Sequence, residues 1–183
     1  YNEPPDFDFD AKDHEELGES LGIIDKERAI KFAGSRAYLL KGKGALLESA
    51  VMQLAEDMLY EEGYEPVVGP VMVNEKALRG TGWAPYGLED VYHIEKDDKW
   101  LVGTSEVYLV STRADEILDP EELPVKMSAR SPCFRREAGS AGADTRGVYR
   151  VHQFSKVEQV IIAKDDPEQS REYHEELLGN AEK

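Results

Sequence analysis

The strongest hydrophobic pattern in the chain lies between Gly42 and Gly63, where apolar residues recur every three or four positions. This spacing places them on one side of an α-helix and predicts a helix across the segment, which Gly63 is well suited to end. The apolar stripe consists of Leu47, Val51, Leu54 and Met58, joined by Ala50, Ala55 and Leu59.

A strand is predicted directly after this helix, from Pro66 to Val73. Pro70 has no backbone N–H to donate to a neighbouring strand, so it indicates an edge strand or a bulge. An apolar helix followed by an apolar edge strand is a candidate dimer surface. Burial of both elements in one core explains the pattern equally well, and the sequence alone leaves both alternatives open.

Shorter elements are expected elsewhere in the chain. Residues 91–102 alternate around a polar turn, which predicts a β-hairpin. The segment after Gly103 is expected to be helical, with Thr104 as its N-cap and Glu106 near the positive end of the helix dipole. The remaining expected elements are a short helix over 14–21, a short strand over 35–40, a helical turn over 74–78, a loop over 79–88 and a helix that opens at Pro167.

Residues 125–162 predict two strands joined by a glycine-bearing loop, with Arg135 directly opposite Phe154. Side chains alternate across a strand, so this register gathers polar and charged residues around one aromatic ring. An arginine can hold a phosphate, an aromatic ring can stack on a base, and carboxylates can bind an amine. A cross-strand ladder of ion pairs is an equally good explanation of the pattern. The face carries Cys133, Arg135, Glu137, Arg150, His152, Phe154, Lys156 and Glu158.

Charge changes the interpretation of this hairpin. Between Lys126 and Lys156 there are seven Lys or Arg residues and two acidic ones, although the whole chain has a net charge of −16. A basic segment in an acidic protein indicates a site for a polyanion. The acidic remainder argues against uniform nucleic-acid binding and fits a surface that favours solubility.

Composition sets limits on the class of protein. The 183 residues suit one domain, and no apolar run approaches the roughly 20 residues that a membrane-spanning helix needs. The acidic, proline-containing N-terminus does not have the pattern of a signal or transit peptide. Cys133 is the one cysteine, which excludes an internal disulfide and fits a reducing, cytoplasmic location without a membrane. His14 opens HEELG, which lacks the second histidine of a zinc-binding pair, so no metal ligand is predicted.

The hairpin residues resemble motif 2 of the class II aminoacyl-tRNA synthetases, in the form found in the seryl-tRNA synthetase family. The resemblance is carried by FRRE at 134–137, the loop AGSAG…DTRG up to Gly147, Arg150, HQF at 152–154 and KVE at 156–158. The segment 44–73 resembles the motif 1 helix and strand of the same family. The resemblance therefore implies an α+β fold, an antiparallel sheet flanked by helices.

The resemblance also implies roles for individual residues. Arg135 would bind the ATP α-phosphate and act as the catalytic residue, also meeting the carboxylate side of serine, while Glu137 would contact the adenine amino group. Phe154 would stack on adenine. The remaining implied roles are ATP binding for Arg150, and serine binding for Thr104, Glu106 and Glu158.

The implied reaction is the ATP-dependent activation of serine to seryl-adenylate, with Mg²⁺, followed by transfer to tRNA(Ser). Catalysis would rest on positioning and charge neutralisation, without a protein nucleophile. The 138–147 loop would meet the acceptor end of the tRNA, and the 44–73 helix and strand would form a homodimer interface.

Residues 1–183 are thus expected to be a partial catalytic domain, with motif 1 over about 44–73 and motif 2 over about 125–162. The motif 3 region and the N-terminal tRNA-binding arm are expected to lie outside it. Two further departures from the family pattern stand out, an extra hydroxyl at Ser105 and an alanine, Ala143, where a basic loop residue is common. Two other functions stay open, a non-enzymatic RNA-binding or regulatory module and a ligase that charges a carrier protein.

Overall fold

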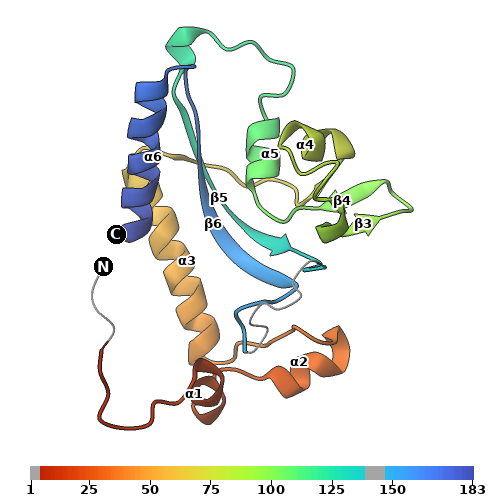
Figure 1. Cartoon of the computed structure of the whole chain (residues 1–183), viewed down its shortest axis with the longest axis vertical. Helices are drawn as coiled ribbons and strands as arrows, with labels where there is room; N and C mark the ends of the chain where they lie inside the picture. Colours follow the sequence, from red (N-terminus) through yellow and green to blue (C-terminus); the bar gives the residue numbers. More distant parts are fainter. Residues whose placement is uncertain (1–4, 139–146) are drawn as a thin grey trace. The chain divides into compact units, whose positions relative to one another are not determined.

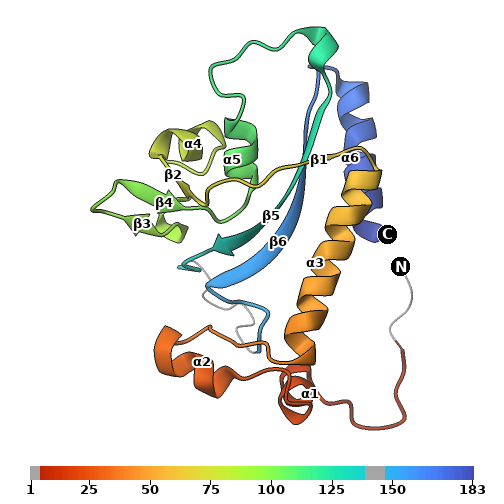
Figure 2. The ribbon, with the colours of Figure 1, turned by 180° about the vertical axis from the view of Figure 1, so that it is seen from behind.

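The computed structural model describes residues 5–138 and 147–183. The chain divides into two compact units. Unit 1 comprises residues 1–48 and 142–151, and unit 2 comprises residues 49–141 and 152–183. The order of elements along the chain is drawn in Figures 1 and 2.

Unit 1 is built on two capped helices, α1 (His14–Ser20) and α2 (Lys26–Ala33). Asp25 caps α2 and also binds Arg28 and Lys41 at 2.7 Å and 2.8 Å. The hydrogen bond from Lys41, together with those from Arg28, holds the pKa of Asp25 well below its usual range. The helix over 14–21 is confirmed. The strand expected over 35–40 is reduced to a single bridge between Ile24 and Leu40, and α2 was not among the predicted elements.

The long helix predicted from the apolar stripe is α3 (Lys43–Glu61). Its stripe is largely solvent-exposed in the described part of the chain, with Val51 54% and Leu54 60% exposed. The alternative in which this stripe is buried in a single core is therefore wrong for the chain by itself.

The main sheet of unit 2 has the order β1-β5-β6, with β1 parallel to β5 and β5 antiparallel to β6. Figures 1 and 2 show the long β5–β6 pair between α5 on one side and α3 with α6 on the other. The elements are β1 (Glu65–Pro66), β5 (Val125–Phe134), β6 (Gln153–Ile162), α5 (Glu106–Ser111) and α6 (Pro167–Glu182).

A second, smaller sheet has the order β2-β4-β3 and contains the hairpin predicted over 91–102. The core of unit 2 is formed where this sheet, α4 and α5 pack beside β5, around residues such as Leu78, Val102 and Leu109. The bounds are β2 (Met72–Val73), β3 (His93–Ile94), β4 (Lys99–Leu101), α4 (Glu75–Gly80) and the short 3₁₀ helices η1 (Leu88–Asp90) and η2 (Pro120–Glu122).

The continuous strand predicted from Pro66 to Val73 is wrong. The segment pairs with β5 at its start and with β4 at its end, so it passes from one sheet to the other. Between the two pairings a Cβ at Gly69 would lie 2.6 Å from the Tyr108 ring, so only glycine permits this close approach. Periodicity could not reveal the change of sheet, because both ends keep an extended, apolar pattern.

The predicted register of the long hairpin is wrong by two residues. Phe154 pairs with Cys133, and Arg135 donates its backbone N–H to the carbonyl of His152 at 2.9 Å. A shift by an even number leaves every side chain on its predicted face, which is why alternation alone could not separate the two registers. The composition of each face is therefore as predicted, while the opposed pairs are not.

Candidate active site

Glu158 of β6 lies at the centre of a polar network. Its carboxylate accepts a short hydrogen bond from the Thr104 hydroxyl, a 3.0 Å bond from the Ser105 hydroxyl and a 3.2 Å bond from the backbone N–H of Glu106. Lys156 lies 2.9 Å from the same carboxylate and donates to the Thr104 hydroxyl at 2.6 Å. Residues from the start of α5 and from β6 therefore meet at one carboxyl group.

This network fixes the charge of Glu158. Burial by itself would raise the pKa of this carboxyl, but the hydrogen bonds from Thr104 and Lys156 and the charge of Lys156 outweigh it, with Ser105 adding to them. The net result is a lowered pKa. A carboxylate that accepts several hydrogen bonds is stabilised in its ionised form, so Glu158 is an anion at neutral pH.

Arg135 follows β5 directly, and its guanidinium lies over two aromatic rings. The distance from its Cζ to the ring centroid is 5.2 Å for Phe154 and 6.0 Å for Trp83, which are cation–π distances. Its Nε donates to the carbonyl of Gly103 at 3.2 Å. A Cβ at Gly103 would lie 3.1 Å from the Trp83 ring, so a larger residue here would crowd that ring. The guanidinium is thus oriented while keeping further N–H donors for a ligand.

The backbone around Arg135 is held on both sides. Arg135 exchanges hydrogen bonds with His152, whose ring Nδ1 lies 3.0 Å from the Arg135 carbonyl. Asp90 accepts from the backbone N–H of Arg136 with its carbonyl at 2.8 Å and from that of Ala138 with its carboxylate at 2.7 Å. A rigid backbone limits the positions that the Arg135 side chain can take, which favours precise placement of a charged ligand.

The structure brings most of the predicted site residues into unit 2. Arg135, Phe154, Thr104 and Glu158 lie on or beside the predicted face. Glu106 meets Glu158 through its backbone N–H, and its side chain makes no hydrogen bond within the described residues.

Two predicted residues, Glu137 and Arg150, and the predicted loop fall outside this arrangement. Glu137 follows Arg136 with a φ of 56°, so the strand conformation has ended there. Arg150 belongs to unit 1 and is described only within that unit. In the predicted tRNA-binding loop, residues 139–146 lie outside the described residues, as does the alanine at 143.

The expectation that Thr104 caps α5 is wrong. Ser105 occupies the N-cap position without a side-chain cap bond, and the Thr104 hydroxyl donates to Glu158 instead. The hydroxyl forms a bond to a charged, partly buried carboxylate, which is stronger than a bond to a backbone amide.

Several residues of the site were missed from the sequence. Trp83 and Asp90 come from segments with loop composition, and nothing in their local pattern marks them. The bond of Ser105 to Glu158 joins positions 53 residues apart, which no local signal reveals.

The described residues contain no group of three or more His, Cys, Asp or Glu side chains that would hold a metal ion. Mg²⁺ stays a prediction from the resemblance. In the same part of the chain, no helix is long and apolar enough to cross a membrane.

Comparison with known proteins assigns this geometry to a family. The family model of the tRNA synthetase class II core domain (G, H, P, S and T) matches residues 86–183, more than half of the chain. The chain belongs to the class II aminoacyl-tRNA synthetase family. The predicted fold class, α+β with an antiparallel sheet flanked by helices, is confirmed.

Seryl enzymes are among the proteins of this family that are similar to the chain. The serine--tRNA ligase of Corynebacterium glutamicum is 49% identical over 177 residues, which cover 97% of this chain and 42% of that protein. Seryl-tRNA synthetase from Pyrococcus horikoshii, solved with ATP, has a TM-score of 0.83 at 44% identity over 91% of this chain and 37% of its own. The cytoplasmic serine-tRNA ligase of Naegleria fowleri, solved with AMP, has a TM-score of 0.90 at 31% identity. The match covers 98% of this chain and 42% of that chain. The chain thus spans less than half the length of these relatives.

Proposed function

We propose that this chain forms the serine- and ATP-binding part of a seryl-tRNA synthetase. The observation that carries the proposal is the arrangement on one face of β5 and β6. Arg135 lies over the Phe154 ring at one end of it, and the ionised Glu158 is held by Thr104 further along the same strand. Phe154 and Glu158 are four positions apart on the strand, about 13 Å, which leaves room for a nucleotide and a small amino acid.

The Arg135 end of this face suits the nucleotide. The guanidinium would form two parallel hydrogen bonds to the α-phosphate and neutralise its charge. Phe154 would stack on the adenine with the ring face that Arg135 does not cover. Glu137 would accept from the adenine amino group, and Arg150 would contribute a further contact to the phosphates.

The Glu158 end suits the amino acid. Glu158 is acceptor-only, so it pairs with the ammonium and hydroxyl donors of serine and not with a carboxylate. Thr104 and Glu106 would line the same pocket. The serine carboxylate would then point towards Arg135 and the α-phosphate.

The proposed reaction is an in-line displacement. A serine carboxylate oxygen forms a bond to the α-phosphorus while the bond from the α-phosphorus to the oxygen of the β-phosphate breaks, giving seryl-adenylate and pyrophosphate. The terminal ribose hydroxyl of tRNA(Ser), presented near residues 138–147, then attacks the acyl carbon and releases AMP. Arg135 contributes by orienting the phosphate and stabilising its developing charge. ATP would enter as its magnesium complex.

The test is serine-dependent exchange between ATP and labelled pyrophosphate, measured on the complete gene product that contains these 183 residues. We expect exchange with serine and only background with the other amino acids. Exchange with none of them would contradict the proposal. Exchange with serine but acylation of a carrier protein instead of tRNA(Ser) would contradict its second step.

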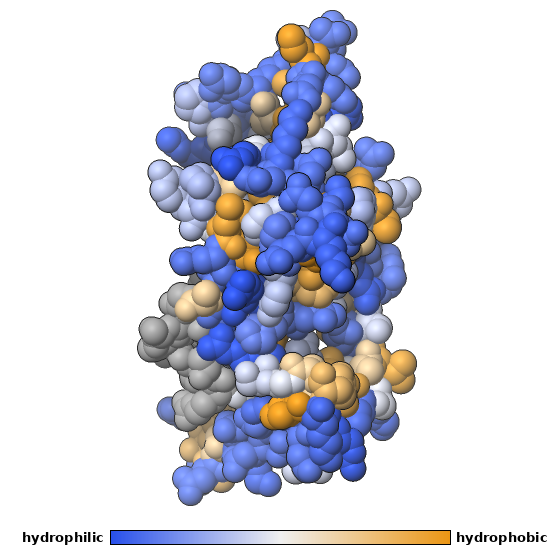
Figure 3. All heavy atoms as spheres, turned by 90° about the vertical axis from the view of Figure 1, so that its right-hand side faces the viewer, coloured by the Kyte–Doolittle hydropathy of each residue, from blue (hydrophilic) through white to orange (hydrophobic). Residues whose placement is uncertain are grey.

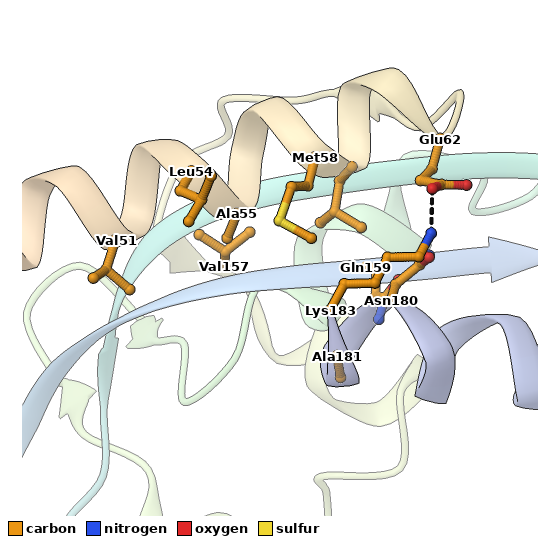
Figure 4. A pocket seen from close by; sticks show the side chains of 11 residues that line it. Val51, Leu54, Ala55, Met58, Glu62, Val157, Gln159, Asn180, Ala181 and Lys183 are labelled. Carbon is orange, nitrogen blue, oxygen red and sulfur yellow. Dashed lines mark hydrogen bonds and ion pairs between the residues drawn. The ribbon is translucent and has the colours of Figure 1, made fainter.

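We also propose that the complete protein is a cytoplasmic homodimer that associates through residues 44–73. The α3 stripe supports this, because Val51 and Leu54 stay more than half exposed. Five residues of the stripe line an open, mostly apolar pocket of about 340 Å³ between α3, β6 and α6 (Figure 4). In the view of Figure 3, hydrophilic residues cover most of the surface, with hydrophobic residues scattered among them. Apolar side chains left exposed on a long helix are typical of an interface.

The dimer is tested by sedimentation of a Leu54→Glu variant. A charge placed on the stripe should weaken association at least about tenfold, because burying an unpaired carboxylate is costly. Leu178→Glu, on the partly exposed α6, is the control. Unchanged association in Leu54→Glu would place the interface elsewhere.

A further inference from the structure

The two oxygens of the Glu158 carboxylate differ greatly in their number of hydrogen-bond partners. Thr104, Ser105, the backbone N–H of Glu106 and Lys156 all approach the same oxygen, Oε2. One carboxylate oxygen has about two lone-pair sites, so four donors saturate it. Within the described residues, Oε1 accepts no hydrogen bond. The network therefore divides the carboxylate into an occupied oxygen and an available one.

Proton positions in this network follow from the chemistry of each group. The ammonium of Lys156 can only donate, so the Thr104 hydroxyl accepts from it and must direct its own proton to Glu158. A carboxylate can only accept, so the Ser105 hydroxyl also donates to it. Each hydroxyl proton is thereby committed to Oε2.

Ser105 is the member of the network that no motif explained. Its side chain is 0% exposed, and although it occupies the N-cap position of α5 it makes no cap bond. The hydroxyl is therefore neither a free group in the amino-acid pocket nor part of the helix structure. The hydroxyl donates to Glu158 at 3.0 Å, and the Tyr108 hydroxyl lies close enough to interact with it.

We infer that Ser105 is a positioning residue, which together with Lys156 occupies Oε2 of Glu158 and so presents Oε1 alone to the donor groups of the amino acid. This inference rests on the proposed function. A carboxylate with one fixed and one available oxygen offers its substrate a single acceptor at a defined place, which favours a small donor-bearing side chain over a longer one.

The titratable groups around Glu158 make the inference measurable. Lys156 is the charged group that faces it from β6. Cys133 of β5 and Tyr108 of α5 also interact with it, and burial raises the pKa of both groups. Both stay uncharged in acid. The other carboxyl group beside the pocket is that of Glu106 at the start of α5, so Glu158 is identified by the shift that Ser105→Ala causes and not by the position of the acid limb alone.

The decisive experiment compares Ser105→Ala with Ser111→Ala in the complete gene product. The Ser111 hydroxyl donates to the Val107 carbonyl within α5, so this matched control removes a serine hydroxyl from the same helix without touching Glu158. For Ser105→Ala we expect KM for serine to rise about tenfold, the scale of a lost bond to a charged group, with KM for ATP changed less than about twofold.

The pH profile separates positioning from packing. Removing a donor from an ionised carboxylate raises its pKa, so the acid limb of kcat/KM for serine should move to higher pH in Ser105→Ala and stay in place in Ser111→Ala. Lys156→Gln removes the positive charge beside the same oxygen. The acid limb of kcat/KM for serine should therefore move further towards higher pH in this variant. The inference would be overturned if Ser105→Ala kept both the wild-type KM for serine and the wild-type position of the acid limb.

A second measurement does not depend on activity. The carboxyl resonance of Glu158, identified by its loss in Glu158→Gln, is titrated by NMR in the wild type and in Ser105→Ala. A higher titration midpoint in the variant is expected, and an equal midpoint would overturn the positioning role even in an active enzyme. If the midpoint moves while the wild type shows no serine-dependent exchange, the positioning role holds and the proposed function is the part that fails.

Discussion

The two faces of the β5–β6 pair differ in the groups that they leave available for further contacts. The face towards α5 carries Lys156 and Glu158, whose charges are paired with each other and with hydroxyls of residues 104 and 105. The face towards α3 carries Val157 and Gln159, which line an open pocket beside exposed apolar side chains. One face carries a polar network with a single acceptor oxygen available, and residues of the other line an open, mostly apolar pocket with α3 and α6.

This difference follows from the alternation of one strand. Because side chains of β6 point to opposite faces in turn, neighbouring residues such as Lys156 and Val157 serve different purposes. Polar groups in a ligand site must be oriented before the ligand arrives, so they are bonded in advance. An apolar surface needs no such orientation and gains free energy when another surface covers it. We therefore expect changes on the α5 face to alter chemistry, and changes on the α3 face to alter stability or association.

The largest effect is expected from Arg135→Ala. Loss of the guanidinium should lower serine-dependent exchange at least about a hundredfold, the scale seen when a group that stabilises transition-state charge is removed. Arg130→Ala is the control from the other face of the same strand, where Arg130 pairs with Glu56 at 3.6 Å. Exchange in Arg130→Ala should stay within about twofold of the wild-type rate. Equal losses in both variants, or wild-type exchange in Arg135→Ala with an unchanged Tm, would contradict the division between the faces.

The second-largest effect is expected from Phe154→Ala. Stacking of a base on an aromatic ring is worth about 1–3 kcal/mol in nucleic-acid complexes, so KM for ATP should rise about five- to a hundredfold. Phe154→Tyr keeps the ring and should restore most of the affinity. Steady-state kinetics with ATP as the varied substrate would measure both. A rise in KM for serine without one for ATP would remove Phe154 from the nucleotide end.

The smallest effect on chemistry is expected from Lys126→Met, on the α3 face. Lys126 bonds Glu176 at 2.7 Å and lies 5.6 Å from the ring centroids of Tyr64 and Tyr173. The variant should lose about 2 kcal/mol of unfolding free energy, as expected for a partly buried pair left with one partner. Exchange should be unchanged within about twofold.

The same variant should respond differently to acid. Burial raises the pKa of Glu176, but the hydrogen bonds from Lys126 and Tyr64 outweigh it and lower the pKa in the folded protein. The pair therefore stabilises the fold above the unfolded pKa of about 4.3, and this stability is lost as pH falls through the lower, folded value. Urea unfolding at about pH 7 and about pH 3 should show a smaller acid loss of unfolding free energy in Lys126→Met than in the wild type. An equal loss would mean that the pair contributes little.

Much of the fold was predictable where one local pattern decides it. The α3 stripe, the proline that opens α6 and the alternation of β5 and β6 each determine their element without help from distant residues. The change of sheet in 66–73 and the helix α2 were not predicted. In α2 the capping Asp25 is bonded by Lys41, 16 positions further on, so part of its stabilisation is tertiary.

The face that the candidate site residues share was predicted better than the contacts that orient them. Alternation placed Arg135, Phe154 and Glu158 on one face, and a register error of two residues could not change that. The partners that orient them come from elsewhere in the chain. Trp83, Asp90 and Ser105 reach the site through the packing of loops and of α5, which sequence patterns do not specify.

The central claim is that Glu158 on the α5 face recognises the amino acid, and Glu158→Gln tests it most directly. This isosteric change removes the charge and replaces one acceptor oxygen by a donor. The experiment measures KM for serine and for ATP in the exchange reaction, with Glu176→Gln as the matched control from α6. The account predicts a rise of about a hundredfold or more for serine, a change within about threefold for ATP, and wild-type values in the control. A KM for serine within about twofold of the wild type in Glu158→Gln would contradict it.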